Sequence, residues 1–168
     1  MTIITKFTVA TDQGMDALSM LTKEIAAQKF SSLLEKRVFD NYLTEHFNRR
    51  TLLDEVNSMS NQWLIVYVDN SPAGYARITS RGKKPQVLEG KRSIRIADFG
   101  VLNKYPEPEV VNSLLEKCLM VCRSYENIWI HEYAGDPMIG TFENKGFRRL
   151  QEAGQHDELP LASVSLIK

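Results

Sequence analysis

The sequence predicts a mixed α/β domain with a central, mostly antiparallel sheet that is flanked by helices. The chain has 168 residues, which is about the length of one average domain. Apolar residues recur at every second position in some segments and at every third or fourth in others, so strands and helices are both expected. A helical segment separates two strand segments, residues 93–102 and 127–134. Parallel strands require a crossover of that kind, so this pair is expected to be parallel.

The first third of the chain is expected to contain one strand and then helices. Polar and apolar side chains alternate over residues 3–10, as in a short strand. A first helix is indicated by apolar residues at helical spacing: Met15, Leu18, Leu21 and Ile25. Ser31 is a residue type favoured at helix starts, so a second helix is expected from there to about Phe47. Residues 51–59 are expected to add a short third helix.

The middle of the chain changes to the period of strands. Residues 62–68 are almost continuously apolar, which is typical of a strand buried on both faces. The turn sequence Asp69-Asn70-Ser71-Pro72 follows, so residues 74–79 are expected to return as the second strand of a hairpin. Residues 81–92 are polar and basic and are expected to form a loop before the strand over residues 93–102.

The last third is expected to alternate helices and strands. A helix after Pro106 and Pro108 should bury one stripe of side chains: Val111, Leu114, Leu115, Cys118 and Cys122. After a strand over residues 127–133, a short helix should open at Asp136-Pro137 and end at Lys145-Gly146, with the glycine in a left-handed conformation. Closing strands are expected over residues 147–152 and 161–167. No repeat or linker composition divides the chain, so one domain over residues 1–168 is expected.

Composition and charge exclude several classes of protein. The 21 basic and 21 acidic residues balance, which argues against broad nucleic-acid binding. Cys118 and Cys122 lie four residues apart in an expected helix, a poor geometry for a disulfide, and two thiols alone do not form a metal site. The longest apolar run, residues 63–68, is far too short to span a membrane. No signal peptide is visible, so a cytoplasmic protein without a resident metal is expected.

Three stretches of the sequence resemble the GNAT acetyltransferase superfamily. The hairpin of residues 63–78 has Gly74 at the start of its returning strand, as in that family. Ile96-Ala-Asp-Phe-Gly-Val101, with Leu114-Leu115 on the next helix, resembles the family's fourth strand and third helix. The segment 136–147 resembles its fourth helix, which ends in a Gly-Phe pair. The resemblance covers residues 62–168 well, and residues 1–61 through the order of elements alone.

The resemblance implies that the strands 93–102 and 127–134 splay apart and that acetyl-CoA, or another acyl-CoA, lies in the wedge as co-substrate. The backbone of one strand would pair with the pantetheine arm: Phe99, Gly100 and Val101. The diphosphate would lie on N–H groups at the start of the next helix: Glu109, Val110 and Val111. The acceptor would be a primary amine of a small molecule or peptide. The helices within residues 14–59, with Tyr42 and His46, would supply the acceptor side.

The sequence departs from this family at two places. The diphosphate loop falls on Pro-Glu-Pro-Glu-Val-Val, residues 106–111, where such proteins have glycines. Proline has no N–H to donate, and the carboxylates of Glu107 and Glu109 would repel phosphates. An ordinary helix start explains the same residues without a ligand. Phe142, which is expected to border the acyl-CoA, stands where many members have a tyrosine acid.

The candidate catalytic residues lie on the two splayed strands. Asp98 could accept the proton of an acceptor ammonium, or it could be an ordinary strand carboxylate. Tyr133 could act as the acid, or it could be a core aromatic residue. His131 and Glu132 point to opposite faces of their strand, so only one of them can face the wedge, and the sequence leaves open which one.

Two function classes follow from the resemblance and the departures. The first is an acyl-CoA-dependent N-acyltransferase. The second is a catalytically impaired GNAT-fold protein that binds a ligand or partner and binds acetyl-CoA weakly or not at all. A homodimer is compatible with either class, and neither a nucleic acid nor a membrane is expected as a partner. The basic segment between two strands is either a solvated loop or an anion site for an acidic substrate: Arg81, Lys83, Lys84, Lys91, Arg92 and Arg95.

Overall fold

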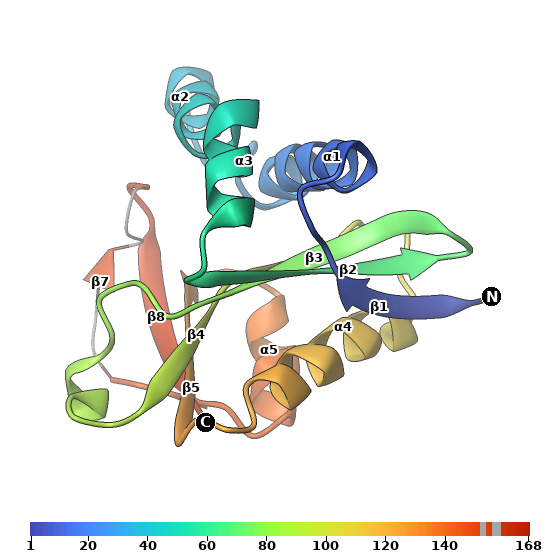
Figure 1. Ribbon diagram of the computed structural model, residues 1–168. Helices are drawn as coiled ribbons and strands as arrows, with labels where there is room; N and C mark the ends of the chain where they lie inside the picture. Colours follow the sequence, from blue (N-terminus) through green and yellow to red (C-terminus); the bar gives the residue numbers. More distant parts are fainter. Residues whose placement is uncertain (152–153, 156–158) are drawn as a thin grey trace.

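One sheet of eight strands organises the protein (Figure 1). The structure, a computed structural model, describes residues 1–151, 154–155 and 159–168. The strands lie in the order β1-β2-β3-β4-β5-β8-β6, and β7 pairs with β8. Their bounds are β1 (Ile3–Phe7), β2 (Asn61–Val68), β3 (Ser71–Thr79), β4 (Ser93–Val101), β5 (Asn127–Tyr133), β6 (Arg148–Arg149), β7 (Gly154–Gln155) and β8 (Ala162–Ile167).

The strand pairing confirms the predicted fold class. Among the strand pairs of the described residues, β4 and β5 are parallel and the other pairs are antiparallel. The helix α4 forms the crossover between the parallel strands, as predicted from the sequence. The helices are α1 (Asp12–Phe30), α2 (Lys36–Phe47), α3 (Arg49–Asn57), α4 (Pro108–Val121) and α5 (Met138–Asn144).

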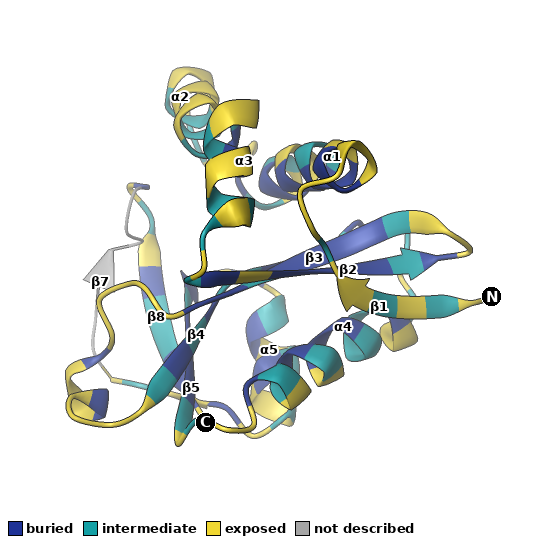
Figure 2. Ribbon diagram, viewed as in Figure 1, coloured by how far each residue is buried: buried dark blue, intermediate teal, exposed yellow. Residues whose placement is uncertain are grey.

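The helices cover both faces of the sheet (Figure 1). α1, α2 and α3 lie on one face, and α4 and α5 lie on the other. The central strands are the most buried part of the molecule, whereas α2 and α3 expose their outer faces (Figure 2). Leu64, Ile65 and Val66 in β2 are fully buried, because each face of the sheet carries its own helix layer. None of the helices within the described residues is long and apolar enough to cross a membrane.

Several predicted boundaries are wrong by a few residues. The backbone N–H of Ser31 donates to the carbonyl of Ala27, so Ser31 ends α1 instead of opening α2. α2 begins only at Lys36. β1 stops at Phe7, three residues before the predicted end. The closing strand predicted over residues 147–152 is reduced to the two residues of β6, and Glu152 lies outside the described residues.

Two turns have the predicted chemistry. Asp69 and Asn70 both have positive φ, 47° and 68°, which is the type I′ geometry that suits a tight hairpin. Gly146 ends the α5 segment with φ of 95°, the left-handed conformation predicted for it. The carboxylate of Asp136 accepts the N–H of Met138 at 2.8 Å, so Asp136 caps α5. The first helical residue is Met138, one residue after the predicted Pro137.

Candidate active site

The parallel strands β4 and β5 separate in the middle of the sheet. Their ladder runs from Ser93–Asn127 to Ile96–Ile130 and ends there, and the two strands then diverge (Figure 1). On the other side of β4, the register with β3 shifts between Arg77 and Ile78. Such a bulge bends the strand and redirects its side chains. The splay that the resemblance implied is therefore present, and it exposes one edge of β4 beyond Ile96.

Two side chains of α1 already bond to this edge of β4. The N–H of Leu102 donates to Ala73 of β3 at 2.8 Å, so the alternating backbone groups of Phe99 and Val101 face the splay. Lys29 Nζ donates to the Phe99 carbonyl at 2.9 Å. Gln28 Nε2 donates to the Val101 carbonyl at 3.2 Å, and Gln28 Oε1 accepts the N–H of Asn103 at 2.7 Å. The sequence did not single out either α1 residue.

The Lys29 ammonium forms ion pairs with two buried carboxylates at the point where β4 and β5 separate. Its Nζ lies 3.3 Å from Glu132 Oε2 and 3.4 Å from Asp136 Oδ2. The side chains of Glu132 and Asp136 are only 6% and 1% exposed. Burial acts to lower the pKa of Lys29, but Glu132, Asp136 and Asp98 outweigh it and hold this pKa above its ordinary value. Lys29 is therefore an ammonium at every physiological pH.

Glu132 has the proton affinity of a base that works near neutral pH. Burial raises the pKa of its carboxyl, Lys29 opposes this, and the charge of Asp136 adds to the increase, so that the pKa reaches about 7. The opposite charge of Lys29 does not prevent the increase, because one ammonium is shared between two carboxylates. A carboxylate with this pKa is suited to take a proton from an ammonium.

The structure resolves the choice between His131 and Glu132. Glu132 lines the cleft described below. His131 Nδ1 lies 3.0 Å from the hydroxyl of Ser165 on β8. The Tyr133 ring packs edge-on against Phe30, at 5.4 Å between centroids. Among the described residues, those that line the cleft do not include Tyr133. Burial, and then the charge of Asp136, raise the pKa of Tyr133.

Asp98 is held as a carboxylate by an arginine. Arg77 Nε lies 2.9 Å from Asp98 Oδ2. Burial acts to raise the pKa of Asp98, but the charge and hydrogen bond of Arg77, with Lys29, bring it below the ordinary value. A low pKa makes Asp98 a weak base. Its negative charge is already paired with Arg77, so it can attract a further cation only at short range.

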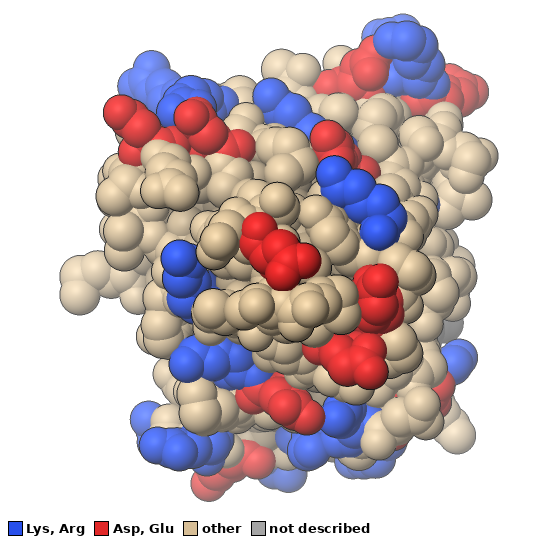
Figure 3. Space-filling model, turned by 90° about the vertical axis from the view of Figure 1, so that its right-hand side faces the viewer, with Lys and Arg blue, Asp and Glu red and all other residues tan. Residues whose placement is uncertain are grey.

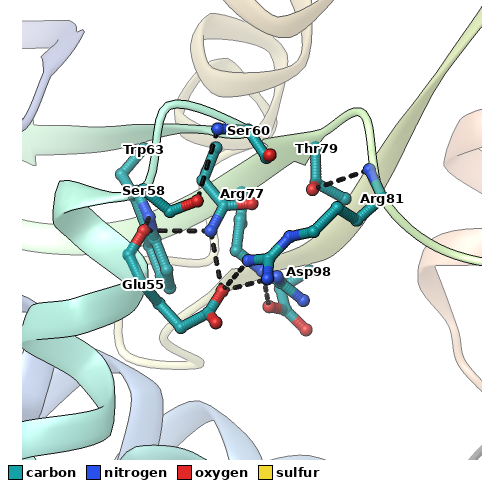
Figure 4. A network of polar contacts seen from close by, with 9 residues as sticks. Glu55, Ser58, Ser60, Trp63, Arg77, Thr79, Arg81 and Asp98 are labelled. Carbon is teal, nitrogen blue, oxygen red and sulfur yellow. Dashed lines mark hydrogen bonds and ion pairs between the residues drawn. The ribbon is translucent and has the colours of Figure 1, made fainter.

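A network of polar side chains joins Arg77 to the rest of the cleft (Figure 4). Glu55 of α3 accepts three hydrogen bonds at its Oε2, from Asn61 Nδ2 at 2.7 Å, Arg77 Nη1 at 3.4 Å and Arg81 Nη2 at 2.6 Å. The Trp63 indole N–H donates to the Glu55 carbonyl at 3.2 Å. This network fixes the Arg77 guanidinium, and through it Asp98, against the end of α3.

A cleft of about 340 Å³ lies between this network and the splay. Aromatic residues form much of its wall: Phe30, Tyr42, Phe47, Trp63 and Tyr75. Its acidic, basic and imidazole side chains are Lys29, His46, Glu55, Arg77, Arg81, Arg95, Asp98 and Glu132. Helices α1, α2 and α3 supply one wall, which includes Tyr42 and His46. The acceptor side was expected on these helices and stays a prediction. An apolar wall with a few convergent charges is typical of a small-molecule site.

The basic segment after β3 does not act as one unit. Arg81 and Arg95 line the cleft, and the Arg95 guanidinium lies 4.7 Å from the centre of the Trp129 ring. Lys84 Nζ instead donates to the carbonyl of Lys91 at 3.0 Å, within the loop itself. The Arg92 guanidinium stacks on Tyr125, at 4.8 Å. Of the two interpretations left open by the sequence, the solvated loop therefore describes only part of the segment.

The start of α4, where a diphosphate was expected, offers few free donors. Pro108 is the first helical residue, and the Val110 N–H donates to the Glu107 carbonyl at 3.0 Å. Val110 is fully buried. Glu109 borders a groove that Ile3 and Thr5 of β1 also line. Acidic and basic side chains are interspersed over the side of the molecule seen in Figure 3.

Phe142 and Gly100 are fixed by packing. Phe142 is fully buried, and its ring contacts those of Phe99 and Phe147 at 5.3 and 5.9 Å between centroids. A Cβ on Gly100 would lie 2.4 Å from Ile25 Cγ2, so glycine is required where α1 crosses β4. Within the described residues, no group of three or more His, Cys, Asp or Glu could hold a metal ion.

Comparison with solved structures identifies the fold. The PaiA N-acetyltransferase of Thermoplasma acidophilum, in complex with coenzyme A, has a TM-score of 0.76 and 11% identity over 98% of both chains. A GCN5-related N-acetyltransferase of Rhodopseudomonas palustris has a TM-score of 0.70 and 13% identity over 100% of this chain and 96% of its own. An Arabidopsis thaliana protein in complex with the bisubstrate analogue CoA-Ac-MVNAL has a TM-score of 0.64 and 16% identity over 98% of this chain and 97% of its own. No protein-family model matches the sequence. The chain has the GNAT fold, as the resemblance implied.

Proposed function

We propose that this protein transfers an acyl group from an acyl-CoA to a primary amine of a small molecule or peptide. One observation carries the proposal. A buried carboxylate of raised pKa, Glu132, lies at the point where β4 and β5 separate and faces a cleft of about 340 Å³. Acyl transfer to an amine needs a group there that accepts a proton near neutral pH.

Asp98 and Glu132 have different roles toward the amine. An amine enters the cleft as an ammonium. The cations of the cleft balance its carboxylates, so the ammonium is attracted only close to Asp98 or Glu132. Glu132 then accepts one proton, which frees the nitrogen lone pair. Asp98 is the weaker base because Arg77 holds its pKa low. Its role is therefore to hold the ammonium and to keep Arg77 in place.

The splayed edge of β4 suits the acyl-bearing end of the donor. When bound, an acyl-CoA supplies a thioester whose C–S bond breaks as the new C–N bond forms. The N–H groups of Phe99 and Val101 face the splay and can stabilise negative charge on an acyl oxygen. The departing sulfur takes a proton. Tyr133 is the donor that the sequence suggested, although its ring packs on Phe30 and does not line the cleft among the described residues. Phe142 has no acidic group, and it is fully buried against Phe99 and Phe147.

The other end of the donor site departs from the usual pattern. The backbone N–H groups that remain at the start of α4 are those of Glu109, Val110 and Val111. The N–H of Val110 already donates to the Glu107 carbonyl. Pro106 and Pro108 cannot donate. We therefore expect weak binding of the nucleotide end. This departure also supports the second candidate, a GNAT-fold protein that binds a ligand without transferring acyl groups.

An acetyl-transfer assay separates the two candidates. Purified protein is given acetyl-CoA and a panel of primary amines, and the released thiol is measured. We expect turnover with at least one amine and a loss of about 10²–10⁴-fold in kcat for Glu132→Gln. Tyr133→Phe tests the candidate acid, and Asp98→Asn should raise KM more than it lowers kcat. No turnover together with no acetyl-CoA binding by calorimetry would favour the second candidate.

A further inference from the structure

The Gln28 carboxamide bonds to β4 as a peptide group of an added strand would. Its N–H₂ donates to the Val101 carbonyl, and its oxygen accepts from the Asn103 N–H two residues further on. In a parallel ladder, one residue of the added strand bonds to two residues of its neighbour that lie two positions apart. Its N–H donates to the carbonyl of the first, and its carbonyl accepts from the N–H of the second. Beyond Ile96, where β5 has left the ladder, Gln28 therefore satisfies one strand position of the open edge.

Lys29 satisfies the preceding position of the same edge. Its ammonium bonds to the Phe99 carbonyl at 2.9 Å, two residues before Val101. Carbonyls that repeat every second residue along an edge match an extended chain that carries amides. Two consecutive side chains of one helix thus hold two consecutive strand positions.

We propose that Gln28 and Lys29 hold the positions on β4 that the amide-bearing arm of the acyl donor takes when it binds. This inference rests on the proposed function, because it identifies which residues the donor must displace. The pantetheine arm has two amides along an extended chain, and it competes with the Gln28 carboxamide for Val101 and Asn103. Displacement of Lys29 from the Phe99 carbonyl leaves that ammonium to Glu132 and Asp136.

Competition lowers the affinity for the donor, so removing the competitor should raise it. Gln28 is exposed, and its side chain is removable without opening the core. We expect Gln28→Ala to bind acetyl-CoA about three- to tenfold more tightly, which is the range for one or two uncharged hydrogen bonds. Adenosine 3′,5′-bisphosphate has no pantetheine arm, so its affinity should not change.

Calorimetric titration of both ligands into three proteins tests this inference. Gln13→Ala is the matched control, because Gln13 is an exposed glutamine at the other end of α1. Tighter acetyl-CoA binding by Gln28→Ala alone, with the nucleotide unaffected, supports the proposal. Unchanged or weaker acetyl-CoA binding by Gln28→Ala overturns it, and so does equal tightening of both ligands.

The acetyl-transfer assay, run on the same proteins, separates this inference from the proposed function. If the wild type transfers acetyl groups and its KM for acetyl-CoA equals that of Gln28→Ala, only the competition is overturned. If neither protein binds or turns over acetyl-CoA at millimolar concentration, the competition and the acyl-transfer function are overturned together.

Discussion

Replacing Glu132 with glutamine should change the free energy of unfolding in a way that depends on pH. The variant should gain stability relative to the wild type as the pH rises. The Glu132 carboxyl is surrounded by charged or titratable groups from several elements: Lys29 of α1, Tyr75 of β3, Asp98 of β4, Tyr133 of β5 and Asp136 after β5. Its pKa is about 7 in the folded protein, against 4.5 without that environment. A carboxyl of this kind binds its proton more tightly when folded. The contribution of Glu132 to the free energy of unfolding is therefore greatest below pH 4.5 and is lost as the pH rises through about 7.

The size of the effect follows from the two pKa values. At pH 8 the ionisation of buried Glu132 costs the wild type about 3 kcal/mol. About 2–3 kcal/mol of this cost develops between pH 5 and pH 8. Glutamine has the same shape and no charge, and it leaves Lys29 paired with Asp136 alone. The pKa of about 7 already includes the bond to Lys29, so only changes in packing add a part that is the same at every pH.

Urea unfolding at pH 5, 6, 7 and 8 measures this difference. The free energy of unfolding of Glu132→Gln minus that of the wild type should rise by about 2–3 kcal/mol from pH 5 to pH 8. Glu89→Gln, at the surface, is the matched control and should give a flat difference. A flat or falling difference for Glu132→Gln would refute the argument, because Glu132 would then not gain proton affinity on folding.

Three further predictions concern the packing and charge of the site. Gly100→Ala should destabilise the protein by about 1–3 kcal/mol in urea unfolding, because its Cβ would lie 2.4 Å from Ile25 Cγ2. The loss should shrink in an Ile25→Ala background, and an equal loss in both would place the strain elsewhere. Phe142→Tyr should cost about 1–3 kcal/mol by the same measurement, because its hydroxyl would enter a fully buried position. A stable variant with faster transfer would instead place that hydroxyl at the reacting groups. Glu107→Gln should tighten acetyl-CoA binding about fivefold at low salt and less at high salt, whereas Glu109→Gln should not, because Glu109 borders the β1 groove. Equal effects of the two in calorimetry would show that both carboxylates reach the phosphates.

Local patterns were sufficient to predict the part of the fold that forms the splay. The crossover helix between residues 93–102 and 127–134 requires parallel strands, and this pairing is observed. The type I′ turn at Asp69-Asn70 and the left-handed Gly146 follow from residue types that tolerate positive φ. Segment ends were predicted less well. Ser31 suits a helix start by its side chain, but its backbone N–H completes the last turn of α1.

The α1 contribution to the site could not be predicted from spacing to the other site residues. Lys29 is 70 residues from Phe99 and 103 from Glu132, and only the packing of α1 over β4 brings them together. One signal was present in the sequence. Lys29 continues the buried stripe Leu18, Thr22 and Ile25 at spacings of four, three and four. A charged residue on such a stripe indicates a buried partner of opposite charge.

The two ends of the proposed donor site follow different physical rules. At the arm end, the carbonyls of Phe99 and Val101 are matched by a carboxamide and an ammonium from α1, so this edge is shaped for amides. At the phosphate end, prolines remove donors and the partly buried carboxylate of Glu107 opposes anions. A helix N-terminus contributes only about 0.3–1 kcal/mol toward an exposed anion, too little to offset a nearby carboxylate. Affinity for a donor should therefore be concentrated at the arm, where Gln28 and Lys29 control access to β4.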